Sequence, residues 1–139
     1  MKQNMIPVAA PSLSPSPVRV LQFKGQLWLD PDPLADILAA YGEDAAEDTV
    51  CRTLADLGTR ITELRMVHSQ CRFADMTMPA RRISAIAGQI GLTELALAAD
   101  NLSDAARQAN GVAVESTFGR LERCYDLAMT EVWSFQGVV

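Results

Sequence analysis

The chain has 139 residues, which is the size of one domain and excludes an enzyme assembled from two large domains. Hydrophobic residues make up 49% and charged residues 21%, a balance that is typical of globular proteins and excludes wholesale disorder. The formal charge of −5 would repel a phosphate backbone, so we expect no nucleic-acid partner.

The sequence also lacks the patterns of membrane insertion and of metal binding. No apolar run approaches the roughly 18 residues needed to cross a bilayer, and the first residues do not resemble a signal peptide. We therefore expect a cytoplasmic protein with no membrane partner. Cys51, Cys71 and Cys124 form no CxxC pair, and His68 is the only histidine, so we expect no metal site and no cofactor.

The N-terminal part differs in composition from the rest of the chain. Residues 1–17 are rich in proline and serine and are predicted to be a disordered tail. Residues 18–32 carry β-branched and aromatic side chains and are predicted to form an extended strap or a hairpin. Asp32 is predicted to cap a short helix that starts at Pro33 and is ended by Gly42.

Residues 33–139 are predicted to form a helical bundle, because apolar residues recur there at steps of three and four. The predicted long helices span 43–71, 77–91, 93–110 and 113–136. Their apolar stripes are formed by Val50, Leu54, Leu57, Ile61, Leu64, His68 and Cys71, then Met76, Ala80, Ile83, Ala87 and Ile90, then Leu95, Leu102 and Ala109, then Val114, Phe118, Leu121, Tyr125, Ala128, Val132 and Phe135. Short connections predict an all-α, antiparallel up-down four-helix bundle with the short leading helix at one end.

The connections between these helices contain recognisable start and stop signals. Asp75 and Thr77 are the candidate caps of the 77–91 helix, which has Pro79 in its first turn. The next helix is expected to end at Asn110 and Gly111, a pair that readily adopts the left-handed conformation.

His68 is the only conventional candidate for a phosphoryl acceptor or a general base, because an unperturbed histidine has a pKa near neutrality. Its place on an apolar stripe predicts a half-buried side chain that is hydrogen-bonded to a neighbour. An active acceptor would project from the polar face instead, so the exposure of His68 distinguishes the two interpretations. Cys71 and Cys124 lie on or beside apolar stripes and are predicted to be structural.

The polar side of the 77–91 helix carries small residues. Arg81, Ser84, Ala85 and Gly88 fall at spacings of three and four and therefore share one face. Such a face lets another element approach closely, and Met78 can provide an adaptable apolar rim. We expect positive charge to be concentrated around the hairpin that the 43–71 and 77–91 helices form. It comes from Arg65, Arg72, Arg81 and Arg82. An ordinary solvated face is the alternative interpretation.

The stretch RRISAIAGQIG at 81–91 resembles the motif H-x-L-K-G-S-A-x-x-L-G of histidine-containing phosphotransfer (HPt) domains, which serve two-component phosphorelays. Hydrophobic and small residues match the motif in place and type at Ile83, Ala87, Ile90 and Gly91, and Leu95 matches the leucine that follows the motif in the family. An alanine-rich helix follows, as it does in the family. With the number of helices, the resemblance covers about residues 33–135 and implies an HPt-like bundle.

The departures from this motif decide the expected function. The motif histidine falls at Arg81, its lysine at Ser84 and its first glycine at Ala85. A guanidinium stays protonated and is not a nucleophile, so phosphoryl transfer at this position is not expected and the protein is not expected to be an enzyme.

The resemblance then implies a pseudo-phosphotransferase: a non-catalytic signalling adaptor or inhibitor that docks a response-regulator receiver domain or a histidine kinase. Its protein–protein contact is expected at Met78, Arg81, Arg82, Ser84, Ala85 and Gly88. The alternative is an active phosphotransfer protein that uses His68 as the phosphoryl acceptor.

Overall fold

The computed structural model describes residues 30–137, and side chains are described as far as Glu131. The predicted tail at 1–17, and all of the predicted strap at 18–32 except its last three residues, lie outside the described range. The described elements are α2 (Asp32–Tyr41), α3 (Glu43–Ser69), the 3₁₀ helix η2 (Phe73–Met76), α4 (Thr77–Gln89), α5 (Thr93–Arg107) and α6 (Gly111–Gly137). Between residues 30 and 137 the chain forms no β-strand.

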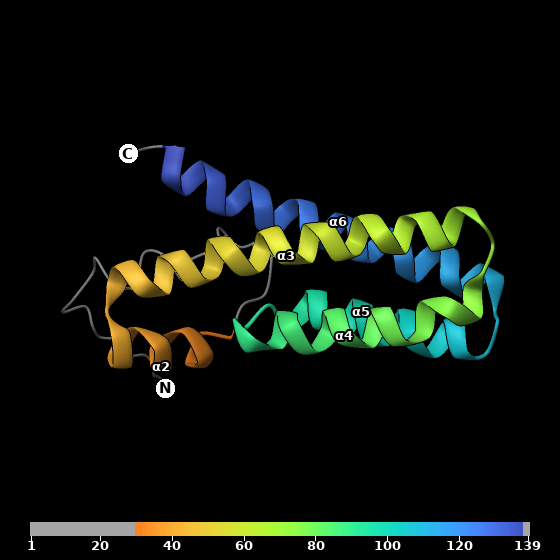
Figure 1. Ribbon diagram of the computed structural model, residues 1–139, viewed down its shortest axis with the longest axis horizontal. Coiled ribbons are helices and arrows are strands. Elements are labelled where there is room, and N and C mark those ends of the chain that lie inside the picture. The colour runs from red at the N-terminus through yellow and green to blue at the C-terminus, as the bar shows by residue number, and fades with distance from the viewer. Residues whose placement is uncertain (1–29, 138–139) are drawn as a thin grey trace, which may run out of the picture.

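The four long helices run alternately up and down, and each is joined to the next by a short turn (Figure 1). The α5 helix packs extensively against both α4 and α6, whereas α3 and α6 touch over a short length and then diverge. The short α2 lies beside the N-terminal part of α3 at one end of the bundle. The predicted all-α antiparallel bundle with a short leading helix is confirmed.

The core consists of the buried residues of the apolar stripes of these helices. Its largest fully buried side chains are Leu34, Leu57, Ile61, Leu64, Met76, Ile83, Ile90, Leu92, Leu95, Leu102, Val114 and Leu121. The side chains of Val132 and Phe135, at the end of the last predicted stripe, lie outside the described range. Tyr125, which was predicted on the core stripe, packs against the core but is half-buried, and its hydroxyl donates to the Leu54 carbonyl of α3. Within 30–137 no helix has an apolar stretch of the length and hydropathy that a membrane span requires.

The start of α2 differs from the prediction by one residue. Asp32 is the first helical residue, and the position before the helix is Pro31. The backbone N–H of Asp32 donates to Oδ1 of Asp30 at 3.1 Å. The carboxylate that satisfies this free helical donor therefore comes from Asp30, two residues before the helix begins.

The turn after α3 also departs from the predicted pattern. The helix ends at Ser69, and Cys71 is exposed with a φ of 57°, so its assignment to the apolar stripe was wrong. The backbone N–H of Cys71 donates to the His68 carbonyl at 2.9 Å, and that of Arg72 to the Val67 carbonyl at 3.3 Å. These hydrogen bonds end α3 and turn the chain away from the helix axis. The helix therefore ends at Ser69, two residues before its predicted end at position 71.

A similar difference occurs between α5 and α6. Ala109, not Asn110 or Gly111, has the left-handed conformation, with a φ of 53°, and it is exposed. Asn110 instead caps α6, because its Oδ1 accepts a hydrogen bond from the Ala113 backbone N–H at 3.1 Å. A residue that caps the start of a helix has a non-helical backbone, and this excludes the left-handed conformation at Asn110. The left-handed residue of the turn is therefore the preceding alanine, Ala109.

Gly91 connects the turn after α4 to the start of α2. This buried residue has a φ of 81°, and its carbonyl accepts a hydrogen bond from the Asp30 backbone N–H at 2.8 Å. A Cβ atom on Gly91 would overlap the Asp30 carbonyl oxygen. The glycine is therefore required both for its backbone conformation and for this close approach.

We expect Gly91→Ala to lower the free energy of unfolding by about 1–3 kcal/mol, because it adds backbone strain and displaces Asp30. Gly88→Ala is the matched control: no atom lies within 4 Å of its added Cβ, and the helical backbone favours alanine. Urea denaturation followed by circular dichroism measures both. Equal stabilities for the two variants would contradict the role given to Gly91.

Candidate functional site

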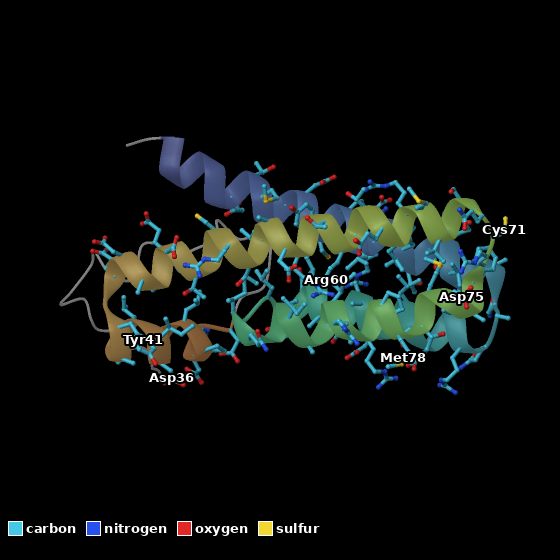
Figure 2. The ribbon with its side chains drawn as sticks, viewed as in Figure 1. Asp36, Tyr41, Arg60, Cys71, Asp75 and Met78 are labelled. Atoms are coloured by element: carbon cyan, nitrogen blue, oxygen red, sulfur yellow. The ribbon has the colours of Figure 1, made fainter. Side chains whose placement is uncertain are left out.

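The exposed face of α4 is built by the periodicity of the helix. Its buried residues, Ala80, Ile83 and Ala87, turn toward the core. The residues predicted to form a contact face lie on the opposite side, where Met78, Arg81, Arg82, Ala85 and Gly88 are exposed and Ser84 is half-buried at the edge. The Met78 side chain is 62% exposed and extends away from the other long helices (Figure 2).

This face, which we call the α4 face, has little side-chain bulk at its centre. Ala85 is exposed, and the position of a Cβ on Gly88 has no neighbouring atom within 4 Å. The backbone of α4 is therefore accessible from outside between Arg81 and the end of the helix. A partner helix or loop can approach it as closely as a small-residue helix face allows.

The charge of the α4 face differs from that of the rest of the surface. All 17 acidic residues of the chain lie in the described part, against nine of its 12 basic residues, because Lys2, Arg19 and Lys24 precede it. Among the described helices, α4 alone contains no Asp or Glu. Arg81 and Arg82 are its only charged residues, so the α4 face is a positive patch on an acidic protein.

The positive patch is smaller than the sequence predicted. Arg65 forms an ion pair with Glu122 of α6 at 2.7 Å, and Arg72 pairs with Asp75 at 2.9 Å. Neither Arg81 nor Arg82 has an ion-pair partner among the residues that the structure describes. Of the four arginines predicted around this site, Arg81 and Arg82 are therefore the two whose charge is not paired within the described chain.

His68 lies on the last turn of α3 and faces away from the α4 face. Its Nε2 lies 2.7 Å from Oε2 of Glu115, and its side chain is 21% exposed. The imidazole ring also contacts Phe118 and Phe73, with ring centroids 5.0 and 5.9 Å apart. The side-chain contacts described for this histidine thus come from α6 and η2, at the end of the bundle where α3 turns into α4.

The three cysteines have different surroundings. Cys71 is exposed, Cys51 is half-buried and Cys124 is buried. Burial raises the pKa of the Cys124 thiol, and the nearby Glu94 carboxylate raises it further, while Arg120 acts in the opposite sense. Cys124 is therefore kept protonated and poorly nucleophilic, as expected of a structural thiol. Within the described range, no cluster of three or more metal-ligating residues occurs.

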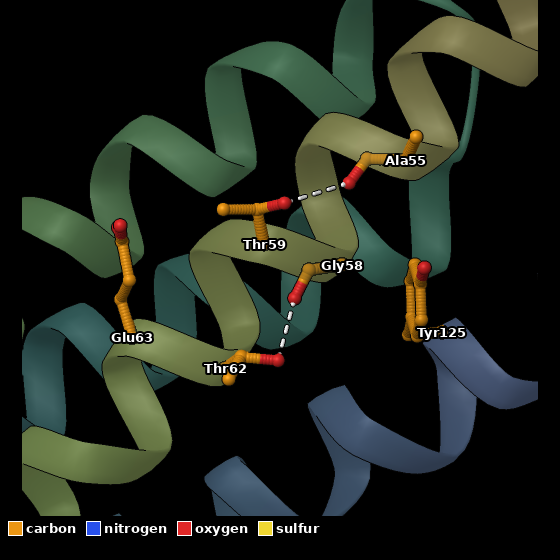
Figure 3. A pocket seen from close by; sticks show the side chains of 6 residues that line it. All are labelled: Ala55, Gly58, Thr59, Thr62, Glu63 and Tyr125. Carbon is orange, nitrogen blue, oxygen red and sulfur yellow. Dashed lines mark hydrogen bonds between the residues drawn. The ribbon is translucent and has the colours of Figure 1, made fainter.

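A shallow groove lies between α3 and α6, lined by Ala55, Gly58, Thr59, Thr62, Glu63 and Tyr125 (Figure 3). The Tyr125 hydroxyl donates to the Leu54 carbonyl at 3.0 Å, and a Cβ on Gly58 would overlap that hydroxyl. The two threonines donate to backbone carbonyls of their own helix, at 3.3 Å for Thr59 and 2.9 Å for Thr62. These hydroxyls are already engaged, so the groove does not present a convergent set of polar groups for a small ligand.

The phenol of Tyr125 is held in its protonated form. Burial raises its pKa, and the Asp126 carboxylate adds to the effect. Its contribution to stability is therefore fully present below the ordinary tyrosine pKa of about 10 and is lost as the pH rises through the higher pKa of the folded state. The contact between Gly58 and Tyr125 was not predicted, because a glycine inside a helix does not indicate which residue will cover it.

The bundle defined by α3, α4, α5 and α6, with α2 at its end, is that of histidine-containing phosphotransfer proteins. It matches the crystal structure of histidine-containing phosphotransfer protein B (HptB) from Pseudomonas aeruginosa PAO1 with a TM-score of 0.70 at 17% sequence identity. The match covers 82% of this chain and 95% of that one. Neither a family model nor a curated protein sequence matches the chain. The predicted resemblance to the HPt fold is confirmed.

Proposed function

We propose that this protein is a non-catalytic, HPt-like component of a two-component phosphorelay, and that its α4 face docks a receiver domain or a histidine kinase. The observation that carries the proposal is Arg81, which falls at the phosphorylated histidine of the HPt motif in the sequence and is exposed on α4. The cytoplasm, where such partners meet, is the proposed location.

The side chain at position 81 explains why docking is proposed without phosphoryl transfer. A phosphoryl acceptor needs a lone pair on a nitrogen that can attack phosphorus, and the arginine guanidinium is protonated at every working pH. Ser84 and Ala85 replace the other polar and close-approach residues of the motif. The chemistry of the motif is lost, whereas the helix that presented it is retained.

The features that remain on the α4 face suit protein recognition. Ala85 and Gly88 leave the helix backbone accessible, Met78 gives an adaptable apolar contact at one end, and Arg81 and Arg82 provide charge. Complementary charges speed association and select among partners. An acidic partner surface with a protruding element at its centre fits these features.

Affinity capture from the native cytoplasm tests the proposal, with wild-type protein compared with Ala85→Trp. The indole adds bulk at the centre of the α4 face, and Ala85 is exposed, so the core is not touched. Receivers or histidine kinases should be captured by the wild type and lost with Ala85→Trp. Ala55→Trp is the matched control, because it adds the same bulk at an exposed alanine of α3, in the groove beside α6. Its partners should be those of the wild type.

Two results would overturn this proposal: the absence of receivers and kinases among the captured proteins, and their unchanged capture by Ala85→Trp. The alternative, phosphoryl transfer through His68, makes a different prediction. It requires acid-labile phosphate on the wild-type protein after incubation with a phosphorylated receiver, and loss of that label in His68→Gln. We favour the non-catalytic function because Nε2 of His68 already contacts Glu115 and the imidazole ring packs against two phenylalanines.

A further inference from the structure

The nine described arginines differ in their surroundings. Five are paired with carboxylates of the chain itself: Arg52 with Asp48, Arg60 with Asp56, Arg65 with Glu122, Arg72 with Asp75 and Arg107 with Asp104. Arg120 and Arg123 lie near the Cys124 thiol on α6. Arg81 and Arg82 stand on a helix that has no acidic residue and have no ion-pair partner in the described part of the chain. Their guanidinium groups are therefore free to pair with carboxylates of another molecule.

Arg81 is the better placed of the two to enter a concave acidic site. It shares its side of α4 with Ala85 and Gly88, one and two turns further along the helix, and neither of them hinders an approaching surface. Arg82 is rotated by about 100° around the helix axis, toward another side of the exposed surface. A guanidinium binds carboxylates through two parallel N–H···O bonds, so a pocket with several carboxylates suits it.

The site at which a receiver domain is phosphorylated is such a pocket, because it is acidic and binds a metal ion. We infer that Arg81, in the docked complex, takes the place of the divalent cation among the receiver's carboxylates, so that this protein and Mg²⁺ bind the receiver competitively. The inference rests on the proposed function and adds how the protein would recognise the receiver domain, namely through its metal-binding carboxylates. Two cations that share one set of carboxylates repel each other, which makes the two bound states mutually exclusive.

This manner of binding would make the protein an inhibitor of the receiver. Metal ions neutralise the charge that develops during phosphoryl transfer, so a receiver without its metal ion is not phosphorylated efficiently. The guanidinium would satisfy the carboxylates without supplying an open coordination position for a phosphoryl oxygen. In the complex the receiver thus remains unphosphorylated until Mg²⁺ and a phosphodonor displace this protein.

The test is a titration of purified receiver domains of the same organism with this protein, in EDTA and in millimolar Mg²⁺ at matched ionic strength. Fluorescence anisotropy gives the dissociation constant. We expect Mg²⁺ to raise the dissociation constant of the wild type at least about tenfold. Arg81→Ala should bind more weakly in EDTA, and its dissociation constant should no longer respond to Mg²⁺.

Arg107→Ala is the matched control, since it removes one exposed arginine of α5 that already pairs with Asp104 at 3.3 Å. It changes the net charge as Arg81→Ala does, and its response to Mg²⁺ should equal that of the wild type. An equal response to Mg²⁺ in the wild type and Arg81→Ala, or tighter wild-type binding in Mg²⁺, overturns this inference alone. If no receiver binds in either condition, the proposed function fails with it.

Discussion

Leu95→Ala is expected to lower the free energy of unfolding by about 2–5 kcal/mol, whereas Leu97→Ala should cost less than about 1 kcal/mol. Both leucines lie on α5, two residues apart, and each substitution removes the same atoms. Leu95 is 0% exposed and Leu97 is 51% exposed. Truncation of Leu95 leaves a cavity in the buried core, while truncation of Leu97 removes a side chain that is half exposed to water.

Urea denaturation measures this difference directly, because a single small domain is expected to unfold in one transition whose midpoint reports stability. The slope of the transition should be the same for the wild type and both variants. Similar losses at the two positions would mean that α5 is rotated about its axis relative to the structure. That result would also remove the basis for assigning an exposed face to α4, which packs against α5.

The long helices were predictable because burial in a bundle follows the helical period. Ile61, Leu64, Ile83 and Leu102 are all nearly or fully buried, as their spacing in the sequence indicates. A repeated apolar stripe is a signal that extends over many residues, so one irregular position does not hide it. For the same reason the antiparallel order followed from the stripes and the short connections between them.

The ends of the helices were less predictable, because they depend on a few hydrogen bonds that compete with one another. Asn110 and Ala109 are both able to follow the last turn of α5, and the structure uses Asn110 as the cap of the next helix. Residue preferences alone favour Asn over Ala in the left-handed position. The choice is made by the helix that follows, which a local pattern does not describe.

In the candidate site, too, features that follow from helical spacing were predictable, whereas contacts between distant residues were not. The shared face of Arg81, Ala85 and Gly88 followed from helical spacing, and the structure places these residues together on the exposed side of α4. The pairing of Arg65 with Glu122 joins residues far apart in the sequence and required the packing of α6 beside α3. Sequence reasoning therefore predicted which arginines are near the site but not which of them are already neutralised.

Restoring the missing acceptor should restore phosphoryl transfer to the α4 face. We expect Arg81→His to acquire acid-labile phosphate from a phosphorylated receiver that the protein binds, whereas the wild type acquires none. A neutral imidazole is nucleophilic near pH 7, and position 81 is exposed among small residues. In the transfer, the phosphorus–oxygen bond of the receiver's acyl phosphate breaks, a phosphorus–nitrogen bond to the imidazole forms, and the aspartate carboxylate is released.

The experiment is made in a His68→Gln background, so that any label belongs to the introduced histidine. Arg82→His is the matched control: it places an imidazole on the neighbouring residue, about 100° away around the helix, where it should not be labelled because the receiver's phosphoryl group must be met in line. Adding Ser84→Lys to Arg81→His should increase the rate, since a cation one turn away offsets the charge of the phosphoryl group. Equal labelling of the two single histidine variants would show that the imidazole is phosphorylated without a specific docking geometry. A folded Arg81→His that binds the receiver and takes up no label would mean that receivers contact another part of the surface than the α4 face.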